Sequence, residues 1–229
     1  MIILFIVTIV VTIKEVIMKV AIIAANGKTG SLVLNECLKK GFEVTAFVRR
    51  EGTVTNPKVN VVVKDIASLS SDDLNGFDAV VNCFGTWTSE TLPLHKEYTA
   101  KLCDLLKGTD TRLIIVGGAG SLYVNKEHTV QLYQTPEFPK EYLEIATSQV
   151  EELAYIRTRS DVAWTFFSPA AVFDPEGRYT GSYTLGGEEF ILNSEGESYI
   201  SYADYALALA DEIENKKFVG KRFTAVGKK

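Results

Sequence analysis

The sequence predicts an α/β fold built on a doubly wound parallel sheet. Short runs of β-branched and apolar residues alternate with longer amphipathic segments from Lys19 onward, and this is the chain order of a sheet with helices on both faces. Runs such as 113–116 are continuously apolar, as expected of strands that helices cover on both sides. A glycine turn follows the first run directly. We expect a single domain over residues 19–229, with a small C-terminal lobe on the substrate side.

Each long strand is expected to stop directly before a glycine, a proline or a polar residue. The expected strands are 20–25, 43–48, 59–64, 79–84, 112–116 and 163–168, with short strands at 190–192 and 199–200 and a last edge strand at 222–226. Leu34 and Leu38 mark the apolar face of the first helix, which Gly41 ends. Further helices are expected over 94–107 and from the capping sequence Ser201-x-x-Asp204 to residue 213. A long loop, 117–139, separates the fifth strand from the next helix.

Composition narrows the class of protein. The 229 residues suffice for one well-buried α/β domain, and a net charge of −5 without any basic stripe argues against a nucleic-acid partner. Cys37, Cys83 and Cys103 lie in apolar contexts without metal-ligand spacing, so we expect reduced core residues of a cytoplasmic protein and no metal site. His95 and His128 also lack ligand spacing and are expected at the surface. The expected assembly is a monomer or a homodimer.

The N-terminus is an apolar extension, residues 1–18, that ends at a second methionine directly before the first strand. Its apolar run, 2–13, is shorter than the about 20 residues that span a bilayer. It also lacks the basic start and the cleavage site of a signal peptide. We interpret it as an upstream start or a non-native extension and expect no membrane association. A weak membrane anchor and an extra element packed on the domain are the alternatives.

The first strand runs directly into a glycine turn, VAIIAANGKTG from Val20 to Gly30. The turn reads Ala25-x-Gly27-x-x-Gly30 against the Gly-x-Gly-x-x-Gly fingerprint of dinucleotide-binding folds. Glycines let the backbone approach a pyrophosphate, and the helix N-terminus directs N–H groups at it. With the alternating pattern, the turn predicts a Rossmann-like domain. The residues expected to hold the dinucleotide phosphates are Ala25, Asn26, Gly27, Lys28, Thr29 and Gly30.

The end of the second strand indicates which dinucleotide is bound. Arg49 and Arg50 stand where NAD-binding folds carry a carboxylate for the ribose 2′-hydroxyl. A guanidinium pairs with the 2′-phosphate of NADP(H), so we expect NADP(H) to be preferred over NAD(H). The alternative is that both arginines are solvated strand-end charges. Asp65 is a candidate acceptor for the adenine amino group. Further cofactor contacts are expected from residues at the other strand ends: Ile66, Phe84, Gly85, Gly117, Gly118 and Pro169.

Together these motifs resemble the atypical short-chain dehydrogenases/reductases, in particular the NAD(P)H-binding group named putative NADH-flavin reductases, which is related to biliverdin reductase B. The resemblance runs from Lys19 to Lys229 and rests on the turn at 26–30, Val-Arg-Arg at 48–50, Lys-Asp at 64–65, Val-Gly-Gly-Ala at 116–119, Trp-Thr-Phe-Phe-Ser-Pro at 164–169 and Ile-Ser-Tyr-Ala-Asp-Tyr-Ala at 200–206. It implies NADPH binding and hydride delivery to a flavin, FMN or FAD, or to another conjugated acceptor.

The sequence departs from this family pattern in three places. Ala24 replaces a usual glycine of the turn. None of the ten tyrosines is followed four residues later by lysine, so the Tyr-x-x-x-Lys pair of the wider superfamily is absent. Gly117-Gly118 stands where a catalytic serine usually follows the fifth strand, with Ser121 as a weak substitute. Carbonyl reduction needs that proton donor, whereas a flavin ring delocalises the charge it receives. The departures therefore favour a conjugated acceptor.

Aromatic side chains are candidates for contact with a planar small-molecule substrate. Trp87, Tyr123 and Phe173 are expected at the substrate site, and Tyr142 is the candidate proton donor or ring contact. The acidic pairs 151–152 and 188–189 are interpreted as solvated charges. The leading hypothesis is an NADPH-dependent flavin reductase. The alternatives are a non-catalytic NADP(H)-binding redox sensor and a reductase of quinones or a tetrapyrrole.

Overall fold

The computed structural model describes residues 17–229. The interpretation of the N-terminal extension therefore lies outside the described residues, except for its last two. An eight-stranded β-sheet forms the centre of the fold. Strand order across the sheet is β3-β2-β1-β4-β5-β6-β10-β8. The strands in chain order are β1 (Lys19–Ile23), β2 (Glu43–Val48), β3 (Asn60–Val63), β4 (Ala79–Asn82), β5 (Arg112–Val116), β6 (Trp164–Ser168), β8 (Tyr183–Gly186) and β10 (Lys221–Gly227).

All neighbouring strands of this sheet are parallel except β10 and β8, which are antiparallel. The order reverses at β1, which has β2 on one side and β4 on the other. The chain therefore continues from β1 to β2 on one side and later returns to β4 on the other side. In parallel sheets, such a reversal of strand order leaves a crevice at the carboxyl ends of the two strands, here β1 and β4. The predicted α/β, Rossmann-like class is confirmed.

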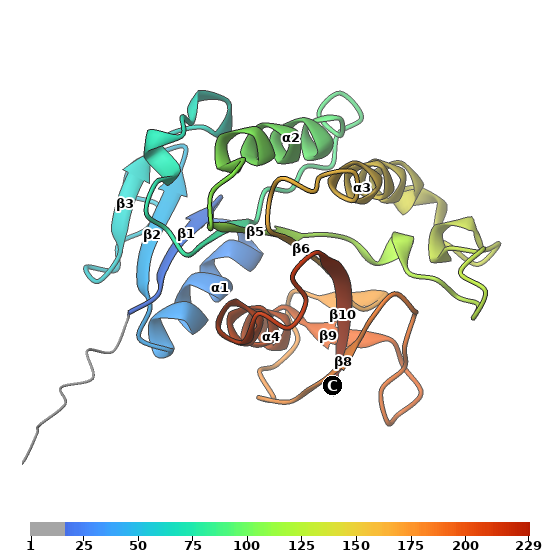
Figure 1. The fold of residues 1–229 in the computed structure, drawn as a ribbon. Helices are drawn as coiled ribbons and strands as arrows, with labels where there is room; N and C mark the ends of the chain where they lie inside the picture. Colours follow the sequence, from blue (N-terminus) through green and yellow to red (C-terminus); the bar gives the residue numbers. More distant parts are fainter. Residues whose placement is uncertain (1–16) are drawn as a thin grey trace, which may run out of the picture.

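Within residues 17–229, two α-helices cover each face of the sheet (Figure 1). α1 (Lys28–Lys39) and α4 (Tyr202–Asn215) pack on one face, and α2 (Leu94–Leu106) and α3 (Leu143–Ile156) pack on the other. The strands are apolar on both faces for this reason: Val20 and Ile22 lie in one core cluster, whereas Ala21 and Ile23 lie in the other. The continuous apolar runs of the sequence follow from this two-sided burial.

The C-terminal third differs from the sequence prediction in its strands. No strand forms at 190–192, where Phe190 makes a single main-chain hydrogen bond to the Tyr123 carbonyl. The last strand, β10, is not an edge strand, because β8 pairs with it and takes the edge. β7 (Val172–Asp174) and β9 (Tyr199–Ser201) form a separate two-stranded parallel sheet. β7 and β8 have three and four residues, too few to give a recognisable period.

Several charged or titratable residues expected at the surface are buried or paired. His95 and Glu152 are each 2% exposed and lie between α2 and α3. Glu188 is half-buried because it accepts hydrogen bonds from Arg222, which is buried in β10, and from Arg157. The interpretation of these three residues as solvated was wrong, since sequence spacing does not reveal a partner that lies far along the chain.

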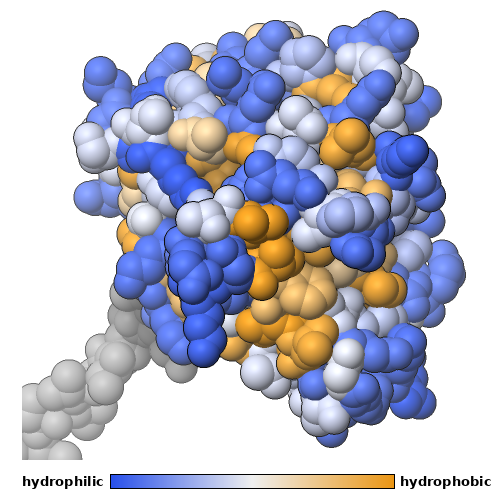
Figure 2. All heavy atoms as spheres, turned by 90° about the vertical axis from the view of Figure 1, so that its right-hand side faces the viewer, coloured by the Kyte–Doolittle hydropathy of each residue, from blue (hydrophilic) through white to orange (hydrophobic). Residues whose placement is uncertain are grey.

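The outer surface of the C-terminal half carries apolar side chains at the centre of one face, surrounded by hydrophilic ones (Figure 2). The expected monomer or homodimer stays a prediction. Among residues 17–229, the helices are all too short or too polar to cross a membrane.

Candidate functional site

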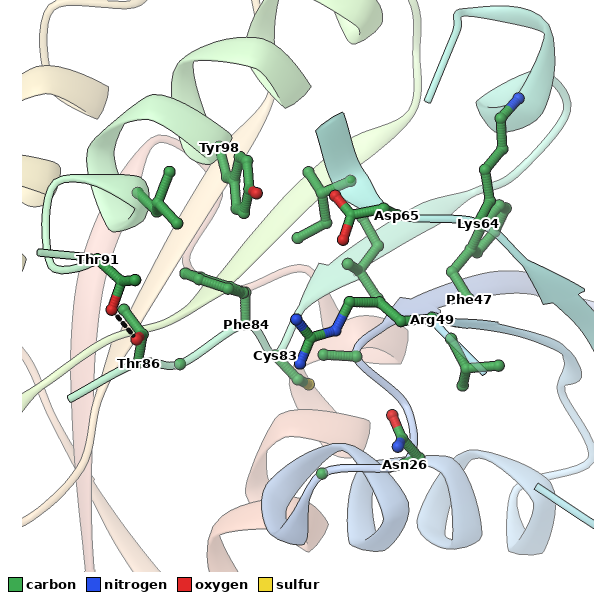
Figure 3. Close-up of a pocket in the computed structure, with 17 residues that line it drawn as sticks. Asn26, Phe47, Arg49, Lys64, Asp65, Cys83, Phe84, Thr86, Thr91 and Tyr98 are labelled. Atoms are coloured by element: carbon green, nitrogen blue, oxygen red, sulfur yellow. Dashed lines mark hydrogen bonds between the residues drawn. The ribbon is translucent and has the colours of Figure 1, made fainter. Parts of the chain in front are cut away.

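A pocket of about 300 Å³ lies at the carboxyl ends of β1, β2, β3 and β4, where the strand order reverses (Figure 3). The start of α1 closes it from one side, and the first turns of α2 close it from the other. The lining residues are Ile23, Ala24, Asn26, Gly27, Phe47, Val48, Arg49, Lys64, Asp65, Ile66, Cys83, Phe84, Gly85, Thr86, Thr91, Leu94 and Tyr98.

The turn between β1 and α1 brings strand and helix unusually close. A Cβ on Gly30 would lie 3.0 Å from the Ala25 Cα and closer still to the Ala24 carbonyl oxygen. Gly27 N–H donates to that same carbonyl at 2.9 Å, and Ala24 has a left-handed φ of 56°. Ala24 thus adopts the left-handed backbone conformation that glycine favours, and this conformation closes the turn.

The start of α1 is open to an anion. Among residues 17–229, no side chain caps this helix through Gly27, and its first turn contains no acidic residue. The N–H groups of the first turn therefore have no side-chain acceptor from the cap, and no acidic side chain of that turn neutralises the positive end of the helix dipole. Lys28, the first helical residue, is exposed and lies 3.9 Å from the Glu176 carboxylate.

Arg49, directly after β2, points its guanidinium into the pocket (Figure 3). Lys64 also lines the pocket, but its ammonium points away and lies 2.6 Å from Asp73. The hydrogen bond from Lys64 lowers the pKa of Asp73 to about 2, with further help from Ser70. Asp65 faces Arg49 across the pocket and accepts the Ala67 N–H through Oδ1 at 2.8 Å.

Aromatic rings form the wall opposite α1. Phe84 follows β4, and its ring meets the Tyr98 ring edge-on with centroids 4.8 Å apart. Burial raises the pKa of Tyr98, the Asp65 carboxylate raises it further, and Arg49 opposes both effects. These three groups therefore share one electrostatic environment. Thr86 and Thr91 are joined by a short hydroxyl hydrogen bond at the pocket edge (Figure 3).

The sequence-predicted cofactor residues divide into two groups. Those that line the pocket are Asn26, Gly27, Arg49, Asp65, Ile66, Phe84 and Gly85. Those outside its lining are Ala25, Lys28, Thr29, Gly30, Arg50, Gly117, Gly118 and Pro169. Gly117 and Gly118 are small for a local reason, since a Cβ on them would collide with Phe166 and Gln149.

The four aromatic candidates for substrate contact also lie outside the pocket lining. Trp87 is 68% exposed and meets Tyr142 edge-on, with ring centroids 6.4 Å apart. Tyr123 stacks on His128 at 4.6 Å. Phe173 packs against Tyr202 at 3.8 Å as part of the core on the α1–α4 face.

Ser121, the weak substitute for the missing serine, is buried and accepts a hydrogen bond from Arg222 at 3.2 Å. Its hydroxyl therefore holds the β10 arginine, away from the pocket lining.

Ten lining residues were not predicted from the sequence: Ile23, Ala24, Phe47, Val48, Lys64, Cys83, Thr86, Thr91, Leu94 and Tyr98. Most of them end a strand or follow one, so the rule that ligands bind beyond the carboxyl ends of parallel strands would have found them. Leu94 and Tyr98 come from α2, and only the packing of this helix brings them to the pocket. Cys83 lines the pocket, whereas Cys37 and Cys103 are fully buried.

These features fit a dinucleotide. The close approach at Gly30 and the uncapped start of α1 suit a pyrophosphate, and Arg49 supplies a cation at the ribose side. The chemistry of this donor set is that of phosphate and adenosine recognition.

Comparison with known proteins agrees with this geometry. Residues 24–216 match the model of a family described as NAD(P)H-binding. The Bacillus subtilis protein YwnB is 48% identical over 210 residues, 91% of this chain and 98% of that protein. A crystal structure named a "putative NADH-flavin reductase" from Streptococcus pneumoniae is 46% identical with a TM-score of 0.89, covering 92% of this chain and 100% of that one.

A Bacteroides thetaiotaomicron structure named a "putative epimerase" is 34% identical with a TM-score of 0.81, covering 93% of this chain and 98% of that one. The chain belongs to the NAD(P)H-binding family of atypical short-chain dehydrogenases/reductases, an oxidoreductase family. The resemblance inferred from the motifs is confirmed. A structure named "ChuY: An Anaerobillin Reductase" from Escherichia coli shares the fold alone, at 16% identity with a TM-score of 0.69, covering 91% of this chain and 97% of that one.

Proposed function

We propose that this protein is an NADPH-dependent oxidoreductase that transfers hydride to a planar conjugated acceptor, with FMN or FAD as the leading substrates. The observation that carries the proposal is the Arg49 guanidinium, directed into a pocket at the strand crossover where NAD-specific folds place a carboxylate. The relative from Streptococcus pneumoniae, 46% identical and named for NADH-flavin reduction, supports the same reaction class.

Nucleotide binding is assigned to three parts of the pocket. The turn at Gly27 and the first N–H groups of α1 hold the pyrophosphate, for which Gly30 provides the close approach. Arg49 pairs with the 2′-phosphate, since Lys64 is already neutralised by Asp73. Asp65 keeps one carboxylate oxygen on Ala67 N–H and offers the other to the adenine amino group.

The acceptor is inferred from what lies beside the pocket. Thr86 continues directly into the exposed Trp87, whose ring meets that of Tyr142 at the start of α3. Ser89 also donates to Glu144 at 2.6 Å, so this segment is tied to α3 at two points. Exposed aromatic side chains that follow a lining residue so directly suit stacking on a flat ring system. We assign Trp87 to ring contact and the Tyr142 hydroxyl to a hydrogen bond with the acceptor.

The chain's own residues orient the partners and do not transfer a proton through a tyrosine–lysine pair, which the sequence lacks. When bound, the reduced nicotinamide supplies the hydride. The pocket fixes the nucleotide from its phosphates and adenosine, and the aromatic pair fixes the acceptor ring. Positioning alone lowers the barrier substantially when the acceptor delocalises the charge it gains.

Steady-state oxidation of NADPH with and without FMN tests this proposal. We expect turnover only when FMN or FAD is present, with a lower KM for NADPH than for NADH. Trp87→Ala is expected to raise KM for FMN and leave KM for NADPH unchanged. Val130→Ala, a change at another exposed apolar side chain, is the control. Tight NADPH binding without turnover on flavins, quinones or tetrapyrroles would refute the reductase and favour a redox sensor.

A further inference from the structure

A ladder of buried polar side chains joins α2 to α3. Thr99 Oγ1 donates to Glu152 Oε1 at 2.6 Å, and one turn earlier on both helices His95 Nδ1 lies 3.3 Å from Ser148 Oγ. His95, Thr99 and Glu152 are each at most 2% exposed. The two pairs are four residues apart on each helix, so they lie on one stripe of the interface.

This ladder continues to the nucleotide pocket. Asn82, the last residue of β4, donates through Nδ2 to Thr99 Oγ1 at 3.5 Å. The other atom of the same amide, Oδ1, accepts the Phe84 N–H at 3.1 Å. Phe84 belongs to the aromatic wall of the pocket, and the following Gly85 also lines the pocket. One connected path therefore runs from Glu152, through two buried side chains, to the main chain of that wall.

The side chain of Phe84 meets the same ladder at a second point. Its ring lies edge-on to the His95 ring, with centroids 5.6 Å apart. The α2–α3 interface thus contacts this wall residue through its amide and through its ring. A change in the ladder shifts the wall, because buried polar groups that lose a partner are costly and the packing around them must adjust.

We propose that Glu152 is a positioning residue for nucleotide binding: through Thr99 and Asn82 it fixes the main chain at Phe84 and so the wall of the pocket. The inference rests on the proposed function and adds control of the same site by a group that does not contact the nucleotide. Apolar residues of α2 and α3 also pack together in the same core cluster, so the contact between these helices does not depend on Glu152 alone.

Glu152 gives this path a dependence on pH. Burial raises the pKa of Glu152 to about 8, opposed by the hydrogen bond from Thr99. Among residues 17–229, its Oε2 has no hydrogen-bond partner, so ionisation would leave a buried charge with a single donor. We expect ionisation to loosen the α2–α3 contact and the wall it supports.

The titratable groups around Glu152 do not change charge in the same range. From α2, burial lowers the pKa of His95 and raises the pKa of Cys103 to about 12, so both are neutral near pH 8. From β4, the facing side chain is the uncharged Asn82. On α3 itself, the neighbouring Glu151 is exposed.

The test compares Glu152→Gln, which keeps an acceptor oxygen for Thr99 but does not ionise, with the exposed control Glu151→Gln. Thr99→Val breaks the path with a side chain of the same shape, and Thr99→Ser restores its hydroxyl. Two quantities are followed from about pH 6 to about pH 9. One is the amide resonance of Phe84 by NMR without nucleotide, and the other is the Kd for NADPH by calorimetry.

In the wild type, Glu151→Gln and Thr99→Ser, we expect the Phe84 resonance to titrate with a midpoint near 8 and the Kd to rise several-fold through the same range. In Glu152→Gln both should be flat, and Thr99→Val should bind more weakly at every pH. If Glu152→Gln and Thr99→Val bind NADPH as tightly as the wild type and the Phe84 resonance titrates unchanged in both, the positioning role is overturned and the nucleotide function is not. Failure of the wild type to bind NADPH at any pH would overturn the nucleotide function and this role with it.

Discussion

Replacing Gly30 with alanine tests the close approach of α1 to β1. The new Cβ would collide most severely with the Ala24 carbonyl oxygen. It would also lie 3.0 Å from the Ala25 Cα and 3.1 Å from the Ala24 carbonyl carbon, whereas ordinary contacts are 3.4–4 Å. These neighbours are main-chain atoms of the turn, so the helix start must move by roughly an ångström. Overpacking of this kind costs about 1–3 kcal/mol, from which the better helix propensity of alanine recovers up to about 1 kcal/mol.

We therefore expect Gly30→Ala to lower the free energy of unfolding by about 1 kcal/mol and to weaken NADPH binding by about tenfold or more, because the N–H groups of the helix start move with it. Urea denaturation gives the first value and calorimetry the second. Gly85→Ala is the stability control, since a Cβ there meets nothing within 4 Å. Unchanged stability and affinity in Gly30→Ala would refute the close-approach argument.

Three further substitutions probe the turn, the nucleotide preference and the buried carboxyl group. Ala24→Gly should raise the free energy of unfolding by roughly 0.5 kcal/mol in urea, because a left-handed alanine costs about 1–2 kcal/mol and glycine loses part of that in chain entropy; a less stable variant would contradict this. Arg49→Ala should raise the Kd for NADPH about tenfold or more in calorimetry and leave that for NADH nearly unchanged, with Arg50→Ala as the control; equal losses on both nucleotides would disprove the assignment. The folded pKa of Glu152 is raised, so its contribution to stability is full below about pH 4.5 and is lost as the pH rises through about 8. Glu152→Gln should therefore gain stability over the wild type by several kcal/mol at about pH 9, measured by denaturation, whereas Glu151→Gln should not; a difference in the free energy of unfolding between wild type and Glu152→Gln that does not change with pH would argue against a buried, titrating carboxyl group.

The parallel half of the sheet was predictable because each strand carries its own signal. β2 and β5 begin and end at the predicted residues, and β6 begins one residue later than predicted. β1 begins one residue earlier and ends two residues earlier than predicted. Burial by helices on both faces makes such strands continuously apolar, which local sequence displays directly. β8 has no such signal: it is a four-residue strand, half of it exposed, whose position depends on pairing with β10.

The site was predictable as far as it depends on strand ends. Arg49, Asp65 and Phe84 each follow a recognisable strand and meet at the pocket. Tyr98 reaches the pocket only through the packing of α2, and no motif marks it.

The partners of buried ion pairs lie too far apart along the sequence for residue spacing to predict them. Arg112 pairs with Glu212 at 2.8 Å across 100 residues of chain. Arg222 likewise lies against Glu188, 34 residues away. Each pair joins separate elements, so only the assembled fold brings the charges together.

A crystal structure grown with excess NADP⁺ tests the central claim most directly. We predict the adenosine half in the pocket at the carboxyl ends of β1 to β4, with the 2′-phosphate beside Arg49 and the pyrophosphate at the start of α1. A nucleotide bound elsewhere, or a pocket that is still empty at saturating NADP⁺, would contradict it.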